Sequence, residues 1–256
     1  MPAEVQYTLL ILVMFATHFQ AGVTGFGGSV LALPFVVFLL GGDLEVSVKL
    51  LVIQSWITTI FILVRSRRHI VWREYARMAL FTLLGLPIGM VMLSYLPGPA
   101  LKTVLGIFMI GVGGRGLRVV LQDIEEATWS PTAAHNWAMN SLLFLGGIMH
   151  GAFGSGGPLI VIYATRALAD KGPFRVTLCM LWMTLNTVLL THWAPGLLSR
   201  PLVWHYTAVC TPFTMASIVL GDYCHHRMNE RPFRLLVFGV LLVAGAALIY
   251  SALRGF

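Results

Sequence analysis

Long apolar runs alternate with short polar stretches along this chain of 256 residues, and about ten such runs can be distinguished. A helix needs about 20 apolar residues to cross a bilayer, within a range of about 17–25. The pattern therefore predicts an all-α polytopic membrane protein with five helical segments in each half. The predicted segments are residues 5–21, 27–41, 46–64, 76–95 and 100–120, then 135–150, 157–168, 175–193, 203–224 and 234–253.

The third, fourth and fifth segments of each half are long enough to span a membrane. The first two segments of each half are shorter. We expect each such pair to form either short spans or a re-entrant pair, with no net crossing. Three crossings plus a pair of this kind give an odd number, so the second half must enter the membrane from the opposite side. The sequence thus predicts two inverted repeats.

Two glycine-rich motifs interrupt the apolar runs at matching places in the halves. The first motif reads GVTGFGGS at residues 22–29, and the second reads GAFGSGGP at residues 151–158. Four glycines coincide at one spacing, pairing Gly22 with Gly151, Gly25 with Gly154, Gly27 with Gly156 and Gly28 with Gly157. Helices broken at matching positions of two repeats are the best sequence indication of a transport site.

Further matches follow in the same order along the two halves. The matched sets are Lys49 and Trp56 with Arg175 and Trp182, residues 70–72 with 202–204, Gly89 with Gly221, and Lys102 with Arg234. We therefore expect one transmembrane domain over residues 1–256. It consists of a first repeat at about 5–120, a cytoplasmic linker at about 121–133 and a second repeat at about 134–254.

Composition strengthens the membrane assignment and supplies an orientation. Hydrophobic residues make up 57% of the chain and charged residues 11%, whereas soluble domains contain about 25% charged residues. The net charge of +7 is explained by cytoplasmic loops, which are rich in Lys and Arg, so it does not indicate a nucleic-acid partner. If residues 65–77 are cytoplasmic, 13 of the 17 Lys and Arg residues lie inside. Both termini are then predicted to lie outside the cytoplasm.

The motifs suggest an anion site because bare backbone polar groups cannot be left in hydrocarbon. A helix is predicted to start directly after each motif, and its first amides are unpaired and carry the positive end of the helix dipole. Two such ends brought together would bind an anion. The candidate binding residues are Thr24, Gly25, Gly27, Gly28, Ser29, Gly154, Ser155, Gly156 and Gly157. The alternative is that the glycines only allow close packing of helices.

Polar and charged side chains inside the spans are further candidates. Gln54 and Asn186 are predicted to donate hydrogen bonds to substrate oxygens, although a bond between helices would also explain them. His150 precedes the second motif and is a candidate carrier of a coupling proton, with a packing role as the alternative. Lys49 and Arg175 could attract an anion, or they could extend to the membrane interface without a functional role.

The pattern G-x-x-G-x-G-G, present in the first motif and again at mid-chain within about 250 mostly apolar residues, resembles the sulfite exporter TauE/SafE family, also called the toluene sulfonate uptake permease family. The resemblance covers essentially the whole chain. It implies transport of sulfite, sulfonates or related organosulfur anions across the bacterial inner membrane without ATPase domains. This chain has Pro158 where the first motif has Ser29, so the two half-sites are unequal.

The sequence therefore predicts a secondary transporter, an exporter of small sulfur-containing anions that works by alternating access. A carrier or channel for another anion, such as a carboxylate, is the alternative. An intramembrane enzyme using Ser155 and His150 is a weaker one, and we expect no enzyme activity. We expect no cofactor, and also no metal site, because Cys224, His225 and His226 are adjacent and have poor ligand geometry. The expected partners are the anion, a coupling proton and the bilayer.

Overall fold

A computed structural model describes residues 2–122, 133–168, 170–197 and 199–224, with isolated positions between residues 235 and 253. These residues form helices joined by turns, and they contain no strand. The helices are α1 (Ala3–Thr24), α2 (Gly28–Leu39), α3 (Leu44–Ser66), η1 (Arg67–His69), α4 (Trp72–Tyr95), α5 (Gly98–Leu121), α6 (Ala133–Phe153), α7 (Gly157–Ala167), α8 (Lys171–Leu197) and α9 (Pro201–Cys224). Part of the predicted segment 234–253, the interior of the predicted linker, His225 and His226 lie outside the described residues.

Most predicted segments correspond to one helix each, but the first segment of each half is longer than predicted. α1 has 22 residues and α6 has 21, and both include the first three residues of their glycine motif. Only the second segments are short: α2 has 12 residues and α7 has 11. At 1.5 Å per residue each short helix extends roughly 16–18 Å, which is about half of the hydrocarbon thickness of about 30 Å.

Five of the described helices are long and apolar enough to cross a membrane, namely α1, α3 (with η1), α4, α8 and α9. Local signals fix several of their ends. The Asp43 carboxylate accepts a hydrogen bond from the Val46 amide (2.9 Å) at the start of α3, as an N-cap residue does. Gly25 ends α1 in the left-handed conformation.

With its five helices of membrane length, the chain is an all-α polytopic membrane protein, as the apolar pattern predicts.

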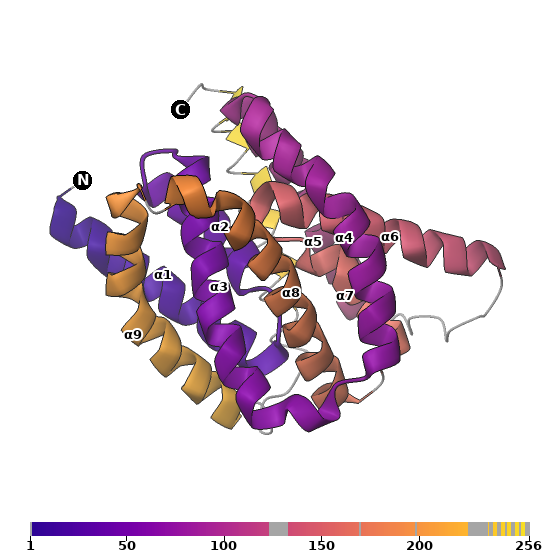
Figure 1. Cartoon of the computed structure of the whole chain (residues 1–256). Coiled ribbons are helices and arrows are strands. Elements are labelled where there is room, and N and C mark those ends of the chain that lie inside the picture. The colour runs from indigo at the N-terminus through magenta and orange to yellow at the C-terminus, as the bar shows by residue number, and fades with distance from the viewer. Residues whose placement is uncertain are drawn as a thin grey trace.

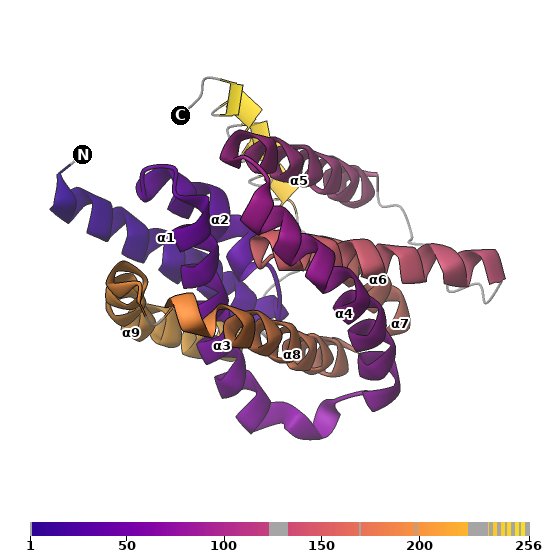
Figure 2. The same cartoon turned by 45° about the horizontal axis from the view of Figure 1, so that its top comes forward.

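Helices from the two halves are packed against each other in a matching way. α3 and α8, the third segments of the halves, lie at the centre, with α1 and α9 on one side and α4 and α6 on the other (Figures 1 and 2). Gly22 of α1 lies against Gly221 of α9, and Gly151 of α6 lies against Gly89 of α4. The sequence comparison pairs these same four glycines, so the first segment of each half contacts the fourth segment of the other.

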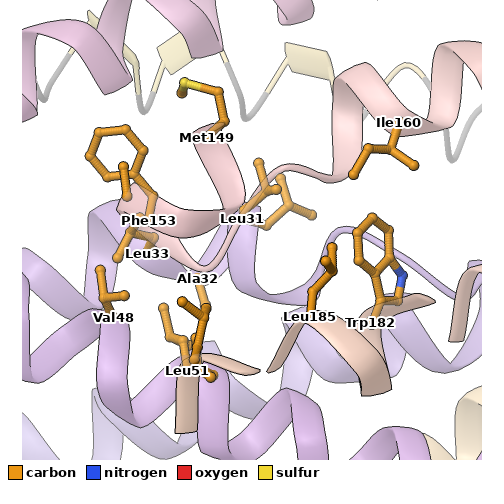
Figure 3. Packing of buried hydrophobic residues seen from close by; sticks show 14 of the residues in the cluster. Leu31, Ala32, Leu33, Val48, Leu51, Met149, Phe153, Ile160, Trp182 and Leu185 are labelled. Carbon is orange, nitrogen blue, oxygen red and sulfur yellow. The ribbon is translucent and has the colours of Figure 1, made fainter. Parts of the chain in front are cut away.

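The short helices lie inside this arrangement. In α2, Ala32, Leu33 and Val36 are completely buried, and Ile160 in α7 is too. Figure 3 shows side chains of α2, α6 and α7 packed against Val48 and Leu51 of α3 and against Leu185 and Trp182 of α8. Because the full-length helices enclose the two breaks, their unpaired backbone groups face protein rather than lipid.

Candidate functional site

The first break lies between α1 and α2 and is formed by two glycines with positive φ. Gly25 has φ 81° and its amide donates to the Ala21 carbonyl (2.7 Å), which ends α1. Gly27 has φ 89° and precedes the first residue of α2. Residues with a Cβ adopt this region at a cost, so both positions favour glycine. The Gly25 carbonyl accepts a hydrogen bond from Nε1 of Trp182 on α8 (3.0 Å).

Thr24 holds this break together. Its hydroxyl donates toward the carbonyls of Gln20 and Phe26 (3.1 and 3.0 Å) and accepts from Nε2 of Gln20 (3.1 Å). These bonds occupy the Thr24 hydroxyl, and Thr24 is absent from the cavity lining described below. In this structure Thr24 bonds within the turn, and the substrate contact expected of it stays a prediction.

The second break lies between α6 and α7 and repeats part of this geometry. Gly154 has φ 61°, and its amide donates to the His150 carbonyl (2.7 Å), as Gly25 does to Ala21. Gly156 differs from its counterpart Gly27, because it has a right-handed conformation with φ −80°. A Cβ on Gly156 would lie 2.0 Å from the Gly146 carbonyl oxygen. Close packing against α6 therefore explains this glycine.

The two breaks meet at one cavity of about 50 Å³. Its lining residues from the breaks and their helices are His18, Ala21, Gly25, Phe26, Gly27, Gly28, Ser29, Val30, His150, Gly154, Ser155 and Gly157. The remaining lining residues come from α3, α8 and α9 and are Ser55, Thr58, Thr59, Ile62, Cys179, Trp182 and Ile218. One water needs at least about 10–15 Å³ of such space. The cavity therefore has room for a few waters or one small solute.

Hydrogen-bond donors without acceptors gather at this cavity. The first intrahelical bond of α2 is from the Leu31 amide to the Gly27 carbonyl, so the Gly28, Ser29 and Val30 amides have no intrahelical acceptor. The start of α7 offers fewer donors, since Pro158 has no N–H. Among the described residues, Oγ of Ser155 is buried and has no hydrogen-bond partner.

No Asp or Glu occurs among the described residues that line the cavity. Two helices begin at its wall and direct the positive ends of their dipoles to it. An anion in the cavity would accept hydrogen bonds from the unpaired donors, and no carboxylate in the described lining would repel it. The arrangement therefore favours a negatively charged ligand.

Gln54 and Asn186 do not line the cavity, although both are completely buried. Nε2 of Gln54 donates to the Thr207 carbonyl (3.0 Å), and Oε1 accepts from Oγ1 of Thr214 (2.7 Å), so Gln54 joins α3 to α9. Asn186 bonds to His150 and to Ser55, which both belong to the cavity lining. Gln54 therefore fits the alternative interpretation, in which it forms a hydrogen bond between helices. Asn186 is hydrogen-bonded to two residues that line the cavity.

The matched cations Lys49 and Arg175 lie outside the cavity lining and are buried, with 7% and 5% of their surfaces exposed. Lys49 is paired with Glu45 one helical turn away. Arg175 is paired with Asp222 of α9 (2.6 Å), which is also 3.8 Å from Arg65. Nε and Nη2 of Arg175 have no partner among the described residues. The Arg175 side chain lies against Gly25, so it is the member of the pair that adjoins a break.

Several residues that line the cavity are not among the binding residues predicted from the sequence. Ser55, Thr58 and Thr59 of α3 do so, as do Cys179 and Trp182 of α8. The hydroxyls of α3 are spaced i, i+3 and i+4, which places them on one helix face. That spacing was a usable signal in the sequence.

A membrane bundle of long helices, in which two broken helices meet at one cavity, is typical of secondary transporters. The TauE family model, described as "Sulfite exporter TauE/SafE", matches residues 10–248, and the chain belongs to this family. The chain is also 26% identical over 192 residues to a protein of Cupriavidus necator named "Probable sulfite/organosulfonate exporter TauE". That alignment covers 73% of this chain and 71% of the relative. No solved structure matches the chain significantly.

Proposed function

We propose that this protein is a secondary transporter that exports small sulfur-containing anions such as sulfite or organosulfonates. The observation that carries the proposal is the cavity between the breaks, where the starts of α2 and α7 present unpaired amides and no carboxylate intervenes. The name of the Cupriavidus necator relative supports the substrate class. The small volume of about 50 Å³ favours a compact anion over a large one.

Binding would involve both repeats. The amides of Gly28 and Ser29 from the first break and the Ser155 hydroxyl from the second would donate to the anion's oxygens. Gly25, Gly27, Gly154 and Gly157 form the cavity walls at the breaks, where the lack of side chains lets a ligand approach the backbone. Gly156 acts by packing. Rocking of one repeat against the other would then open the site to alternate sides of the membrane.

The cavity is closer to one end of the molecule. Thr58, Thr59 and Ile62 belong to the C-terminal half of α3, and Cys179 and Trp182 to the N-terminal half of α8. The ion pairs of Asp222 with Arg65 and Arg175 are at the same helix ends. The positive-inside rule assigns this end to the cytoplasm. We therefore propose that the cavity is nearer the cytoplasmic face of the inner membrane, with both termini on the opposite side.

A coupling proton is better supported at His18 than at His150. His150 uses both ring nitrogens in hydrogen bonds, to Gly156 and Asn186. Nδ1 of His18 donates to the Met14 carbonyl (2.9 Å), whereas its buried Nε2 has no partner. This nitrogen is therefore free to bind a coupling proton. The other titratable groups of the cavity lining are His150 from α6 and Cys179 from α8, and α2, α3 and α9 contribute none.

An enzymatic role has less support. A serine nucleophile needs a base within hydrogen-bond reach, yet Ser155 has no partner among the described residues, and His150 bonds elsewhere. The family is one of transporters, which also points away from catalysis.

The direct test is flux into proteoliposomes of purified protein, measured for sulfite, sulfoacetate, taurine, thiosulfate and succinate. We expect saturable transport of sulfite or a sulfonate. Transport of succinate alone would favour the carboxylate alternative. Saturation together with gradient-driven accumulation would identify a carrier, whereas purely passive flux would identify a channel. Protein that moves none of these anions would contradict the proposal.

Ser155→Ala probes the site with little disturbance, because its hydroxyl makes no bond within the protein. We expect a rise in half-saturation of roughly tenfold, as for the loss of one hydrogen bond to a charged group, with an unchanged melting temperature. Ser141→Ala is the matched control on the exposed side of α6. Equal half-saturation for Ser155→Ala and wild type would remove Ser155 from the site.

A further inference from the structure

A chain of hydrogen bonds runs from the second break to the opposite wall of the cavity. The Gly156 amide donates to Nδ1 of His150 (3.4 Å). Nε2 of His150 bonds to Oδ1 of Asn186 (2.9 Å), and Nδ2 of Asn186 bonds to Oγ of Ser55 (3.2 Å). The three side chains belong to α6, α8 and α3, so this relay connects helices of both repeats.

The direction of the relay follows from its first bond. A backbone N–H can only donate, so Nδ1 of His150 must accept and the neutral ring carries its proton on Nε2. That proton is donated to Oδ1 of Asn186, which leaves Nδ2 to donate to Ser55. The His150 ring is also held in place by stacking on Trp182, with ring centroids 5.6 Å apart and an angle of 13°. Each donor in the relay therefore points toward Ser55.

Ser55 is the last residue of the relay, and its hydroxyl proton has no acceptor among the described residues. Its Oγ accepts from Asn186, and among the described residues it makes no other hydrogen bond. The two other hydroxyls on this face are used differently, because Thr58 donates to the Gln54 carbonyl (2.8 Å) and Thr59 to the Ser55 carbonyl (2.6 Å). Ser55 is partly exposed and lines the cavity. Its proton is thus available to a ligand there.

We infer that Ser55 donates a hydrogen bond to an oxygen of the transported anion, and that Asn186 and His150 are positioning residues that orient its hydroxyl. The inference rests on the proposed transport function and identifies a contact beyond the two breaks. Successive hydrogen bonds polarise one another, so the relay strengthens Ser55 as a donor. A ligand atom that only accepts, such as a sulfite or sulfonate oxygen, fits this position.

This assignment changes two roles predicted from the sequence. Asn186 acts on the anion through Ser55 and not by direct contact. His150 uses both ring nitrogens in the relay, so neither is left to take up a coupling proton. The relay thereby separates the two buried histidines of the cavity, leaving His18 with the unpaired ring nitrogen.

The experiment compares sulfite transport by wild type, Ser55→Ala, Ser55→Thr, Asn186→Ala and the double variant in proteoliposomes. Melting temperature in detergent without sulfite is measured in parallel. We expect Ser55→Ala to raise half-saturation roughly 10- to 100-fold with a maximal rate near that of wild type. Ser55→Thr keeps a hydroxyl and should recover most of the affinity. Ser94→Ala, an exposed serine that bonds to the Met90 carbonyl, is the control.

Asn186→Ala tests the positioning role. Without Asn186, the Ser55 hydroxyl can turn to a backbone carbonyl of its own helix, so half-saturation should rise less than in Ser55→Ala. In the Ser55→Ala background the same change should add little to half-saturation, because the orienting group then has nothing to orient. A purely structural role would instead lower the melting temperature and the yield of protein equally in both backgrounds.

The outcomes separate this inference from the proposed function. If wild type transports sulfite and Ser55→Ala has the same half-saturation as wild type, the inference about Ser55 is overturned and the proposed function stands. Additive effects of the two substitutions on half-saturation would overturn the relay and leave Ser55 as an independent contact. Wild type that transports no sulfur anion would overturn the proposed function and, with it, the contact inferred for Ser55.

Discussion

The first and second glycine-rich breaks share four glycines, but the backbone needs the third glycine for different reasons in each. Gly27 has φ 89°, whereas its counterpart Gly156 has φ −80° and is tightly packed against the Gly146 carbonyl. The first glycines agree instead, since Gly22 and Gly151 both allow close contact with a helix of the other repeat. The same glycine of the motif therefore meets two different requirements. In the first half it allows a positive φ, and in the second half it leaves room for the neighbouring backbone.

The breaks also differ in what they present to a ligand. α2 begins with Gly28, Ser29 and Val30, which all carry an amide N–H and line the cavity. α7 has Pro158 at the position of Ser29, so one donor is missing. The second break supplies side-chain groups in compensation, namely the Ser155 hydroxyl and the His150 relay. The two halves thus have a short helix in corresponding places, while the chemical groups at the two breaks differ.

The largest expected effect is on folding at the second break. In Gly156→Ala the new Cβ would lie 2.0 Å from the Gly146 carbonyl oxygen. Because this oxygen belongs to the backbone of α6, it cannot move aside without shifting the helix. We expect little or no folded protein, measured as monodisperse yield in detergent. Gly157→Ala is the control, because its Cβ would meet no atom closer than 3.8 Å. Normal yield of Gly156→Ala would show that α6 and α7 are packed less tightly than described.

The matched cations offer the next contrast. Asp222→Ala leaves the buried Arg175 without its ion-pair partner, and we expect a loss of about 3 kcal/mol, since breaking a buried pair costs about 3–5 kcal/mol and Asp222 is 29% exposed. Glu45→Ala also leaves a buried cation, Lys49, but it should cost less than Asp222→Ala, because the Glu45 side chain is 47% exposed and water screens its pair with Lys49. Denaturation in detergent would measure both. Equal losses would mean that the two pairs are equivalent.

A smaller effect is expected at the first break. Gly27→Ala places a Cβ on a residue with φ 89°, which costs roughly 1–2 kcal/mol for the left-handed conformation. The nearest atoms belong to the side chain of Gln20, at 3.0 Å, and this side chain can move. The variant should fold with a lowered melting temperature. If the yield were as low as that of Gly156→Ala, the positive φ of Gly27 would be as important for folding as the close packing of Gly156.

The smallest effects concern the unequal donors. Ser29→Pro removes one amide N–H from the start of α2, and Pro158→Ala adds one to the start of α7, at helix positions where proline is tolerated. We expect Ser29→Pro to raise the half-saturation for sulfite several-fold, and Pro158→Ala to lower it by a smaller factor. Flux in proteoliposomes is the measurement. No change in either variant would argue that the helix starts do not contact the anion.

Much of the architecture was predictable from the sequence because hydropathy and glycine spacing are properties of the chain itself. Apolar runs of membrane length predict the spans, and the repeated motif predicts that two broken helices meet. Gly22 packs on Gly221 as Gly151 packs on Gly89, and these two contacts correspond because the sequence comparison matches Gly22 with Gly151 and Gly221 with Gly89. The lengths of α1 and α6 were underestimated, because each helix continues into the motif that was taken as its end.

The lining of the cavity was predictable only in part. Of the candidates, Gly25, Gly27, Gly28, Ser29, Gly154, Ser155, Gly157 and His150 line the cavity, and Thr24, Gly156, Gln54, Asn186, Lys49 and Arg175 do not. A buried polar side chain is visible in a sequence, but the direction of its bonds depends on which helix packs beside it. Gln54 faces α9 and bonds to Thr207 and Thr214, whereas Ser55, the next residue, faces the cavity.

The sequence by itself determined an all-helical membrane protein of two related halves with a break in each, because period, hydropathy and composition act locally along the chain. The tertiary structure alone decided which donors reach the cavity, which histidine keeps an unpaired nitrogen and which acid pairs with Arg175. These outcomes depend on contacts between residues far apart in sequence. Burial makes those contacts obligatory, since each polar group removed from water must find a partner in whichever helix lies next to it.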